Sequence, residues 1–441
     1  MKTVKVDFSK KIGKIKPMHA VNNGPRQKGA SLSWDISDYF KEIGIPYVRL
    51  HDTEMCYGSN QFVDIHCIFP DFNADPYNEE SYNFECTDKL LISIKNAGAE
   101  VYYRLGESID HFSKKLYVNP PKDYLKWAVI CEHIVRHYNY GWANGYNLGI
   151  KYWEIWNEPD NKAMWTGNAT QFYELYRITA NHLKAMFPEI KIGGYSASGF
   201  YMLNRENPND WFKTLVPYMH GFFKYITDDE TKAPLDFFSW HCYADVPEEV
   251  GLHAKYAREL LEQYGFGDVE SFLTEYNNFY SLGEQPNEQD GYTAELGATL
   301  IVAQKSPMDM MMYYDMRLTT YMNGLVYKVA TNSYEFKTFP AYYSMVAFGK
   351  LYRLGEEVKS ECSDGMYCLG AQSDNGQRAV MIVNRSDEDK VILSVSGAEP
   401  TYRKGYLINK ENHFKQVLTG AFWNDDVVSI PKDSVLYVEL F

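Results

Sequence analysis

The segment that decides the fold reads Ile150-Lys151-Tyr152-Trp153-Glu154-Ile155-Trp156-Asn157-Glu158-Pro159. Its first seven residues are mostly aliphatic or aromatic, as is typical of a strand in a parallel sheet that is covered on both faces. Asn, Glu and Pro, which are all disfavoured inside strands, follow directly. The segment therefore predicts a buried parallel strand whose carboxyl end carries Asn157 and Glu158.

Similar runs recur along the first three quarters of the chain. In order, the candidate strands are residues 16–20, 47–51, 100–105, 150–156, 191–196, 237–243, 271–276 and 310–315. Amphipathic stretches typical of helices lie between them, at residues 34–43, 86–97, 124–138, 170–187, 253–264 and 292–305. These units predict an α/β fold, a (β/α)8 TIM barrel. Residues 52–76 and 203–233 are expected to form loops that shape its mouth.

The pattern changes after about residue 328. A helix-like stretch at residues 340–351 is followed by alternating apolar and polar runs, at residues 366–373, 378–384, 390–396, 401–408 and 427–441. Turn sequences such as Asp374-Asn375-Gly376 separate them. We therefore expect a catalytic barrel at residues 12–328 and an appended antiparallel β-sandwich domain at residues 329–441. A strand within residues 1–11 is expected to complete that second domain.

Composition and charge exclude several classes of partner. The formal net charge of −14 opposes binding to nucleic acid phosphates or to an anionic membrane surface, so we expect neither. No apolar run approaches the length of a membrane span, and residues 1–8 lack the apolar core of a signal peptide. The seven scattered cysteines are typical of reduced thiols, which favours a cytoplasmic location. Without a Gly-rich phosphate loop or a Cys/His cluster, no cofactor and no metal are expected.

Two glutamates lie where a barrel places its reactive groups. Glu158 follows the fourth predicted strand and Glu275 closes the seventh, and the carboxyl ends of barrel strands meet at one mouth. Strands four and seven face each other there, so the two carboxyl groups can converge on one bond. A protonated carboxyl beside an ionised one suits the cleavage of a glycosidic bond. The aromatic content of 16% suits either stacking on sugar rings or a large core.

The two motifs resemble those of a known group of enzymes. Trp156-Asn157-Glu158-Pro159 and Thr274-Glu275-Tyr276-Asn277 are similar to clan A of the glycoside hydrolases, and more narrowly to family 39, which contains β-xylosidases and α-iduronidase. Arg49-Leu50-His51, Tyr82-Asn83-Phe84 and Trp240-His241-Cys242-Tyr243 support this resemblance. It implies a retaining mechanism in which Glu158 is the acid/base and Glu275 is the nucleophile.

The resemblance also implies which residues bind the substrate. Asn157 would hydrogen-bond the sugar 2-hydroxyl, a contact that strengthens in the transition state. His241 and Tyr243 would line the glycone subsite, and Arg49 and His51 would shape its floor. A buried ion pair within the barrel is the structural alternative for Arg49.

Two positions depart from the β-xylosidase pattern. Tyr314 and Asp315 stand in the eighth predicted strand where those enzymes have a Trp and a Glu. The loop His51-Asp52-Thr53-Glu54 lacks the Gly that they carry after the His. We expect Tyr314 and Asp315 to contact the sugar, so both departures bear on the identity of the substrate.

The sequence therefore predicts a retaining, exo-acting hydrolase of short oligosaccharides or simple glycosides that is most similar to a β-xylosidase. An α-L-arabinofuranosidase, an endo-glycanase or transglycosylase with the same residues, and a non-catalytic sugar-binding barrel are the alternatives. Association into a homo-oligomer is expected by analogy with the family.

Overall fold

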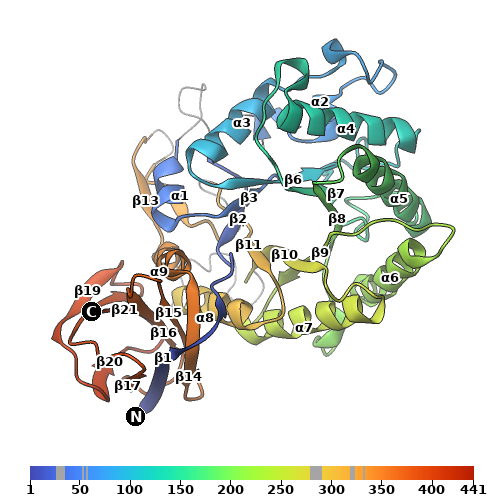
Figure 1. Cartoon of the computed structure of the whole chain (residues 1–441). Coiled ribbons are helices and arrows are strands. Elements are labelled where there is room, and N and C mark those ends of the chain that lie inside the picture. The colour runs from blue at the N-terminus through green and yellow to red at the C-terminus, as the bar shows by residue number, and fades with distance from the viewer. Residues whose placement is uncertain (26–34, 52–53, 56–57, 279–290, 318–322, 331–332) are drawn as a thin grey trace.

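A closed barrel of parallel strands forms the body of the molecule (Figure 1). The computed structural model describes residues 1–25, 35–51, 54–55, 58–278, 291–317, 323–330 and 333–441. Around the barrel the strands are β2 (Ala20–Asn22), β3 (Tyr47–Arg49), β6 (Glu100–Leu105), β7 (Tyr152–Ile155), β8 (Lys191–Ala197), β9 (Phe237–Tyr243), β10 (Glu270–Asn277) and β11 (Met310–Tyr313). Because β11 also pairs with β2, the sheet closes, and the predicted (β/α)8 barrel is confirmed.

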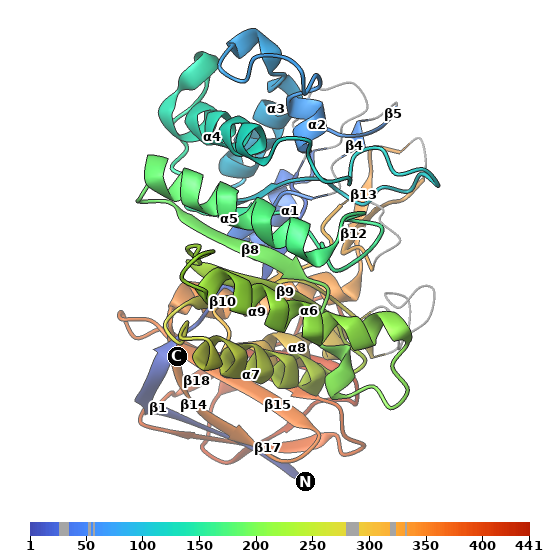
Figure 2. The ribbon, with the colours of Figure 1, turned by 90° about the vertical axis from the view of Figure 1, so that its right-hand side faces the viewer.

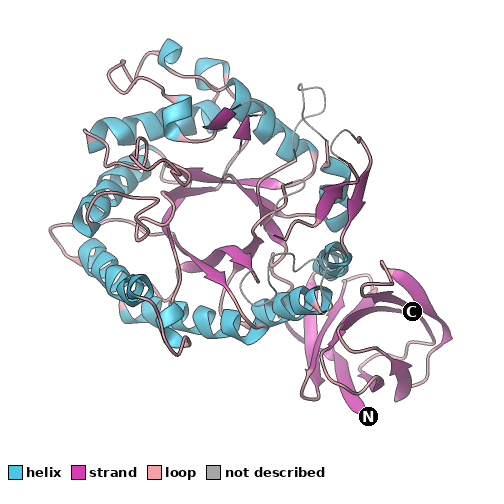
Figure 3. Ribbon diagram, turned by 180° about the vertical axis from the view of Figure 1, so that it is seen from behind, coloured by secondary structure: helices cyan, strands magenta, loops and turns pink. Residues whose placement is uncertain are grey.

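Helices surround this barrel (Figure 3). They are α1 (Ser37–Ile43), α3 (Glu85–Asn96), α4 (Tyr124–Tyr140), α5 (Ala169–Met186), α6 (Asp210–Thr227), α7 (Pro247–Gln263), α8 (Tyr292–Lys305) and α9 (Pro340–Leu354). The start of α5 shows how local sequence sets a boundary, because Asn168 caps the helix and forms a capping box with Gln171. Buried Phe172, Leu175 and Tyr176 then recur at helical spacing on its inner face.

Aromatic side chains fill the barrel below its mouth. Tyr102, Tyr152, Phe237 and Phe272 form a separate buried cluster with Met310 and Met312 of β11. The interior is therefore packed, as in other barrels of this kind, and polar groups are left to the carboxyl ends of the strands. Figure 2 shows the short strands β4 (Glu54–Met55), β5 (Gly58–Gln61), β12 (Val326–Lys328) and β13 (Phe336–Thr338) gathered on that side.

The predictions for two segments of the barrel were wrong. Residues 203–233 were expected to be a loop, but they contain α6. This helix was not predicted because Pro217 and Gly221 are residues that usually interrupt helices. Burial of Leu215, Met219 and Phe222 outweighs that cost. The first strand lies at Ala20–Asn22 rather than at residues 16–20, since Pro17 has no backbone N–H to pair. A short helix, α2 (Ile65–Ile68), also lies in the predicted loop 52–76.

The second domain is a single sheet that curls over its own core. Its nine strands follow the order β19 (Lys415–Ala421), β18 (Tyr402–Ile408), β21 (Ser434–Leu440), β16 (Arg378–Asn384), β15 (Met366–Gln372), β14 (Glu356–Cys362), β1 (Lys2–Lys14), β17 (Lys390–Ser396) and β20 (Asp426–Ser429). Neighbours are antiparallel except β1 and β17. The predicted β domain is confirmed, β1 lies between β14 and β17 in its sheet, and Figure 1 places both termini in this sheet.

Three details of this domain differ from the prediction. Residues 427–441 form two strands, because Pro431 and the turn around it separate β20 from β21. The strands β14 and β19 were not predicted, since both are rich in charged or exposed residues.

The division at residue 328 stays a proposal: α9 packs on α1 and α8 of the barrel and also on β15 and β16 of the sheet.

Within the described part of the chain, none of the helices has the length and apolar character needed to cross a membrane.

Candidate active site

Two carboxyl groups meet at the mouth of the barrel. Glu158 follows β7 and Glu275 lies on β10, at the carboxyl ends of the fourth and seventh barrel strands. One carboxylate oxygen of each glutamate and a ring nitrogen of His241 all lie within 4.8 Å of one another. The side chain of Glu275 is 5% exposed and that of Glu158 is 12% exposed, so water reaches both only in part. The structure thus brings together the two glutamates that the sequence singled out.

The turn after β7 holds Glu158 in an uncommon backbone conformation. Trp156 and Glu158 have positive φ angles of 72° and 44°, a region that residues other than glycine adopt mainly in strained or functional positions. The amide of Glu158 donates to the carbonyl of Ser196 at 3.1 Å. Its carboxylate accepts from the side-chain amide of Asn161 at 3.0 Å and lies 2.8 Å from Nδ1 of His241. These contacts fix the direction in which the carboxyl group points.

Glu275 lies in a more buried and more strongly charged environment. Its Oε1 accepts from Nη1 of Arg49 at 2.9 Å, and its Oε2 accepts from the hydroxyl of Tyr243 at 2.7 Å. Nε2 of His51 lies 3.6 Å from Oε1. Burial raises the pKa of Glu275 above its ordinary value, while His241, Arg49 and Tyr243 oppose the rise. Its neighbours therefore favour the ionised form of a carboxyl group that burial drives toward protonation.

Arg49 on β3 ties the strands together beneath this carboxylate. The residue is fully buried, and besides Glu275 its guanidinium donates to Glu154 at 2.7 Å, Asn22 at 3.0 Å, Asn157 at 2.5 Å and Ser196 at 3.0 Å. Arg49 therefore forms the ion pair with Glu154 that the structural alternative expects and also contacts Glu275, while its role beneath a sugar stays a prediction. Sequence reasoning missed Asn22, Glu154 and Ser196. Only Glu154 carried a sequence indication, as a charged residue in the middle of an apolar strand.

His241 on β9 lies between the two carboxyl groups. Its Nδ1 is 2.8 Å from Oε1 of Glu158 and 3.6 Å from Oε2 of Glu275. Burial lowers the pKa of His241 to about 4, so the ring is neutral at neutral pH. A neutral imidazole can exchange a hydrogen bond with either carboxyl group without adding a charge to the pair.

Comparison with known proteins places this arrangement in a family. The model of the glycosyl hydrolases family 39 matches residues 2–328. The chain belongs to this family. It is therefore a glycoside hydrolase that acts on a carbohydrate, which confirms the resemblance seen in the motifs.

Individual relatives of this family 39 enzyme are distant in sequence. A β-xylosidase from Geobacillus stearothermophilus is 24% identical over 388 residues, which cover 78% of this chain and 71% of that protein. The structure of a glucosidase from Croceicoccus marinus has a TM-score of 0.79 at 20% identity, with 100% of this chain and 98% of that chain covered. A monomeric β-xylosidase from Caulobacter crescentus CB15 has a TM-score of 0.73 at 15% identity, with 100% and 99% covered. The two structures show a shared fold.

Asn157 lies inside the site of the family 39 enzyme, with its side chain fully buried. Its Oδ1 accepts from Arg49, and its amide nitrogen is 3.8 Å from the sulfur of Met164. The oxygen of Asn157 is therefore occupied by Arg49. The amide group has only the sulfur of Met164 as a weak partner among the described residues. Asp52, which was also expected to bear on the substrate, lies outside the described residues.

Tyr314 and Asp315 occupy different positions at the end of β11. The ring of Tyr314 is 6.0 Å from that of His51 and 6.5 Å from that of Tyr243, so it lies among the site residues. Asp315 is fully buried, and its carboxylate accepts from Nε of Arg317 at 2.7 Å. The guanidinium of Arg317, which sequence reasoning missed, lies 6.0 Å from the centre of the Tyr314 ring. Asp315 thus holds an arginine beside Tyr314.

Three groups of described side chains come close enough to surround a cation: Glu158, His241 and Glu275; Asp64, His66 and Glu107; and Cys242, Glu249 and His253. In each group, protein donors already occupy carboxylate oxygens. Arg104 and Ser108 donate to Asp64, and Arg205 donates to Glu249. These groups therefore suit ion pairing within the protein better than a bound metal.

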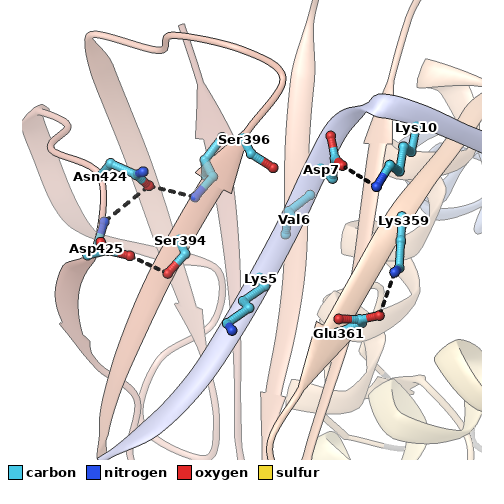
Figure 4. A pocket seen from close by; sticks show the side chains of 11 residues that line it. Lys5, Val6, Asp7, Lys10, Lys359, Glu361, Ser394, Ser396, Asn424 and Asp425 are labelled. Carbon is cyan, nitrogen blue, oxygen red and sulfur yellow. Dashed lines mark hydrogen bonds and ion pairs between the residues drawn. The ribbon is translucent and has the colours of Figure 1, made fainter.

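A hollow of about 380 Å³ lies on the curled sheet, between β1, β14 and β17 (Figure 4). Four of its charged side chains form ion pairs, Lys10 with Asp7 and Lys359 with Glu361. Charges that are already compensated offer little to a ligand, so the barrel mouth is the stronger candidate for the functional site.

Proposed function

We propose that this family 39 enzyme is a retaining glycosidase in which Glu158 is the acid/base and Glu275 is the nucleophile. The observation that carries the proposal is that one carboxylate oxygen of Glu158 lies within 4.8 Å of one carboxylate oxygen of Glu275. Carboxyl groups about 5–5.5 Å apart suit direct attack by one of them, whereas inverting enzymes keep about 6.5–9.5 Å for a water molecule. The separation in this site supports a double displacement.

In the first step, Glu158 donates its proton to the glycosidic oxygen while the ionised carboxylate of Glu275 attacks the anomeric carbon. The bond from that carbon to the leaving oxygen breaks, and the leaving group departs as a neutral alcohol. The glycone remains as an ester of Glu275. In the second step, Glu158, now ionised, takes a proton from a water molecule whose oxygen attacks the anomeric carbon. Glu275 is released, Glu158 is protonated again, and two inversions give net retention.

The surroundings of the two carboxyl groups support this division of roles. Glu275 contacts a permanent cation, Arg49, which stabilises the charge that a nucleophile needs. Glu158 contacts the neutral groups His241 and Asn161 and is the more exposed of the two, which suits a group that exchanges protons with a leaving group and with water. Arg49 also holds the oxygen of Asn157, which leaves the amide to meet the sugar 2-hydroxyl.

For the substrate, we propose a β-xyloside that is cleaved from the end of a short oligosaccharide. Relatives from Geobacillus stearothermophilus and Caldicellulosiruptor saccharolyticus, 24% and 22% identical, are β-xylosidases. A panel of p-nitrophenyl glycosides tests this, with the β-D-xyloside expected to give the highest kcat/KM. A higher value for an α-L-arabinofuranoside or a β-D-glucoside would overturn the choice of sugar and leave the mechanism standing.

Two measurements test the mechanism. Proton NMR of the first product formed should show the same anomer as the substrate, and the opposite anomer would overturn the proposal. A Glu275→Ala variant should be inactive until azide is added, and should then yield the glycosyl azide of inverted configuration. Glu270→Ala, which removes a carboxylate from the other end of the same strand, is the control and should keep its activity. Full activity of Glu275→Ala would exclude Glu275 as the nucleophile.

A further inference from the structure

An exposed tryptophan lies next to the loop that carries Glu158. Trp153, Trp156, Trp165 and Trp240 are fully buried, but Trp211 is 38% exposed. It lies in the first turn of α6. Because barrel helices run antiparallel to the strands, the start of α6 lies on the mouth side of the barrel.

The polar edge of this indole is bound to the loop of the acid/base. Nε1 of Trp211 donates to the backbone carbonyl of Asp160 at 3.0 Å, and Asp160 is two residues beyond Glu158. The carboxylate of Asp160 accepts in turn from the hydroxyl of Ser198 at 2.5 Å, which joins the loop after β7 to the loop after β8. This hydrogen bond fixes the ring by its polar edge. The exposed apolar surface of the ring takes no part in the bond.

The position of Trp211 assigns it to one side of the scissile bond. The acid/base must reach the leaving oxygen, so the leaving group lies on the Glu158 side of the site and the anomeric carbon lies on the Glu275 side. Trp211 is bound to the Glu158 loop and therefore lies on the leaving-group side of the site. A flat aromatic surface at such a place matches the apolar C–H face of a pyranose ring, whose hydroxyl groups can remain in water.

We infer that Trp211 is the platform of a leaving-group subsite that takes a pyranose ring, so that the enzyme is adapted to oligosaccharides rather than to simple alkyl glycosides. The inference rests on the proposed function, because it takes Glu158 as the group that protonates the leaving oxygen. Two further exposed apolar residues, Met202 and Leu203, lie in the segment that joins β8 to α6.

The test compares two substrates that share one glycone. For a β-xylosidase these are xylobiose and methyl β-xyloside, whose leaving groups are both alcohols that need a proton, although only the first contains a sugar ring. Replacing Trp211 by Ala should lower kcat/KM for xylobiose by about 3- to 10-fold, which corresponds to the loss of one aromatic stacking contact. The value for methyl β-xyloside should stay within about 2-fold of that of the parent.

Two further variants separate stacking from damage to the loop. Trp211→Phe keeps an aromatic surface but loses the bond to Asp160, and should retain most of the preference for xylobiose. Trp423→Ala removes a second exposed tryptophan of the described residues, which lies between β19 and β20 of the curled sheet, and should change neither value.

Three results would overturn the inference. An equal fall for both substrates would mean that Trp211 only supports the Glu158 loop, and an unchanged xylobiose value would mean that no ring stacks there. If the parent cleaves other glycosides but no xyloside, the test uses the disaccharide and the methyl glycoside of the sugar that it does cleave. A parent that cleaves no glycoside would overturn the proposed function itself and this inference with it.

Discussion

Glu275 and Glu158 have identical side chains, but the two sides of the site that hold them differ in burial and in the charge of their partners. Glu275 is the more buried, and its contacts include the guanidinium of Arg49 and the hydroxyl of Tyr243. Glu158 is more exposed, and its contacts include the amide of Asn161 and the neutral ring of His241. The difference teaches that one chemical group can serve as nucleophile or as acid depending on what surrounds it.

The largest effect should separate the two glutamates by leaving group. Glu158→Gln should lower kcat/KM for a methyl glycoside by about 10²- to 10⁴-fold, since an alkoxide leaves slowly without a proton. The same variant should lose much less on a 2,4-dinitrophenyl glycoside, whose leaving group is already stable as an anion. Glu275→Gln should lose activity on both, as measured by steady-state kinetics. Equal losses for Glu158→Gln on the two substrates would contradict the assignment of the acid.

Removing the cation tests the Glu275 side. Arg49→Met leaves Glu154 and Glu275 buried without a counter-charge, so the free energy of unfolding should fall by about 3–5 kcal/mol in urea titrations. The double variant Arg49→Met/Glu154→Gln should recover part of that loss. Lys89→Met, which removes an exposed ion pair with Glu85, is the control and should leave the free energy of unfolding almost unchanged. If the free energy of unfolding fell as little for Arg49→Met as for the control, Glu154 and Glu275 would not depend on Arg49 as their counter-charge.

A smaller effect should appear in the pH profile. The hydroxyl of Tyr243 stabilises ionised Glu275 and so lowers its pKa, against the rise caused by burial. In Tyr243→Phe the pKa of Glu275 should rise, and because the attack needs the ionised form, the acid limb of kcat/KM should move to higher pH. At neutral pH kcat/KM should fall roughly 10- to 100-fold, as expected for a lost hydrogen bond to a charge.

Tyr276→Phe is the matched control, since this hydroxyl lies on the same strand as Glu275 but donates to Thr299. Its acid limb should coincide with that of the parent. A Tyr243→Phe profile that also coincides with the parent would remove Tyr243 from the ionisation of Glu275.

The smallest effect should come from the Glu158 side. Asn161→Ala removes one neutral donor to the carboxylate, so kcat/KM for a methyl glycoside should fall by about 2- to 10-fold, with little change for a dinitrophenyl glycoside. Asn168→Ala, which removes the cap of α5 a few residues away, should instead cost about 1 kcal/mol of unfolding free energy and leave the ratio of the two substrates unchanged. A similar fall on both substrates would mean that Asn161 does not act through the acid.

Most of the barrel could be predicted from the sequence because its strands are short apolar runs that end in polar residues. Seven of the eight predicted strands overlap the observed ones closely, and the exception is the first strand, near Pro17. The helix α6 was missed because Pro217 and Gly221 contradict a helix locally, and only the burial of its apolar face stabilises it. The charged strand β14 was missed because pairing with β1, which comes from the other end of the chain, is what makes it a strand.

The site could be predicted only in part for the same reason. Glu158 and Glu275 were identified from motifs that are local in sequence, and so was His241. Neither Arg317 nor Ser196 belongs to a recognisable local motif. Ser196 gains its role by accepting a hydrogen bond from Arg49, which is far away in sequence, and Arg317 gains its role by folding back to donate to Asp315.

By itself, the sequence determined the class of fold and the glycoside hydrolase family, and it singled out the two glutamates that we propose as catalytic, because periodic burial and the Asn157-Glu158-Pro159 motif are properties of short segments. Only the tertiary structure decided that Arg49 serves Glu154 and Glu275 together, that His241 lies between the two carboxyl groups, and that Trp211 borders the loop of Glu158. Such roles depend on distances between strands and loops that are remote in the chain, and closing the barrel is what brings those distances to hydrogen-bond length.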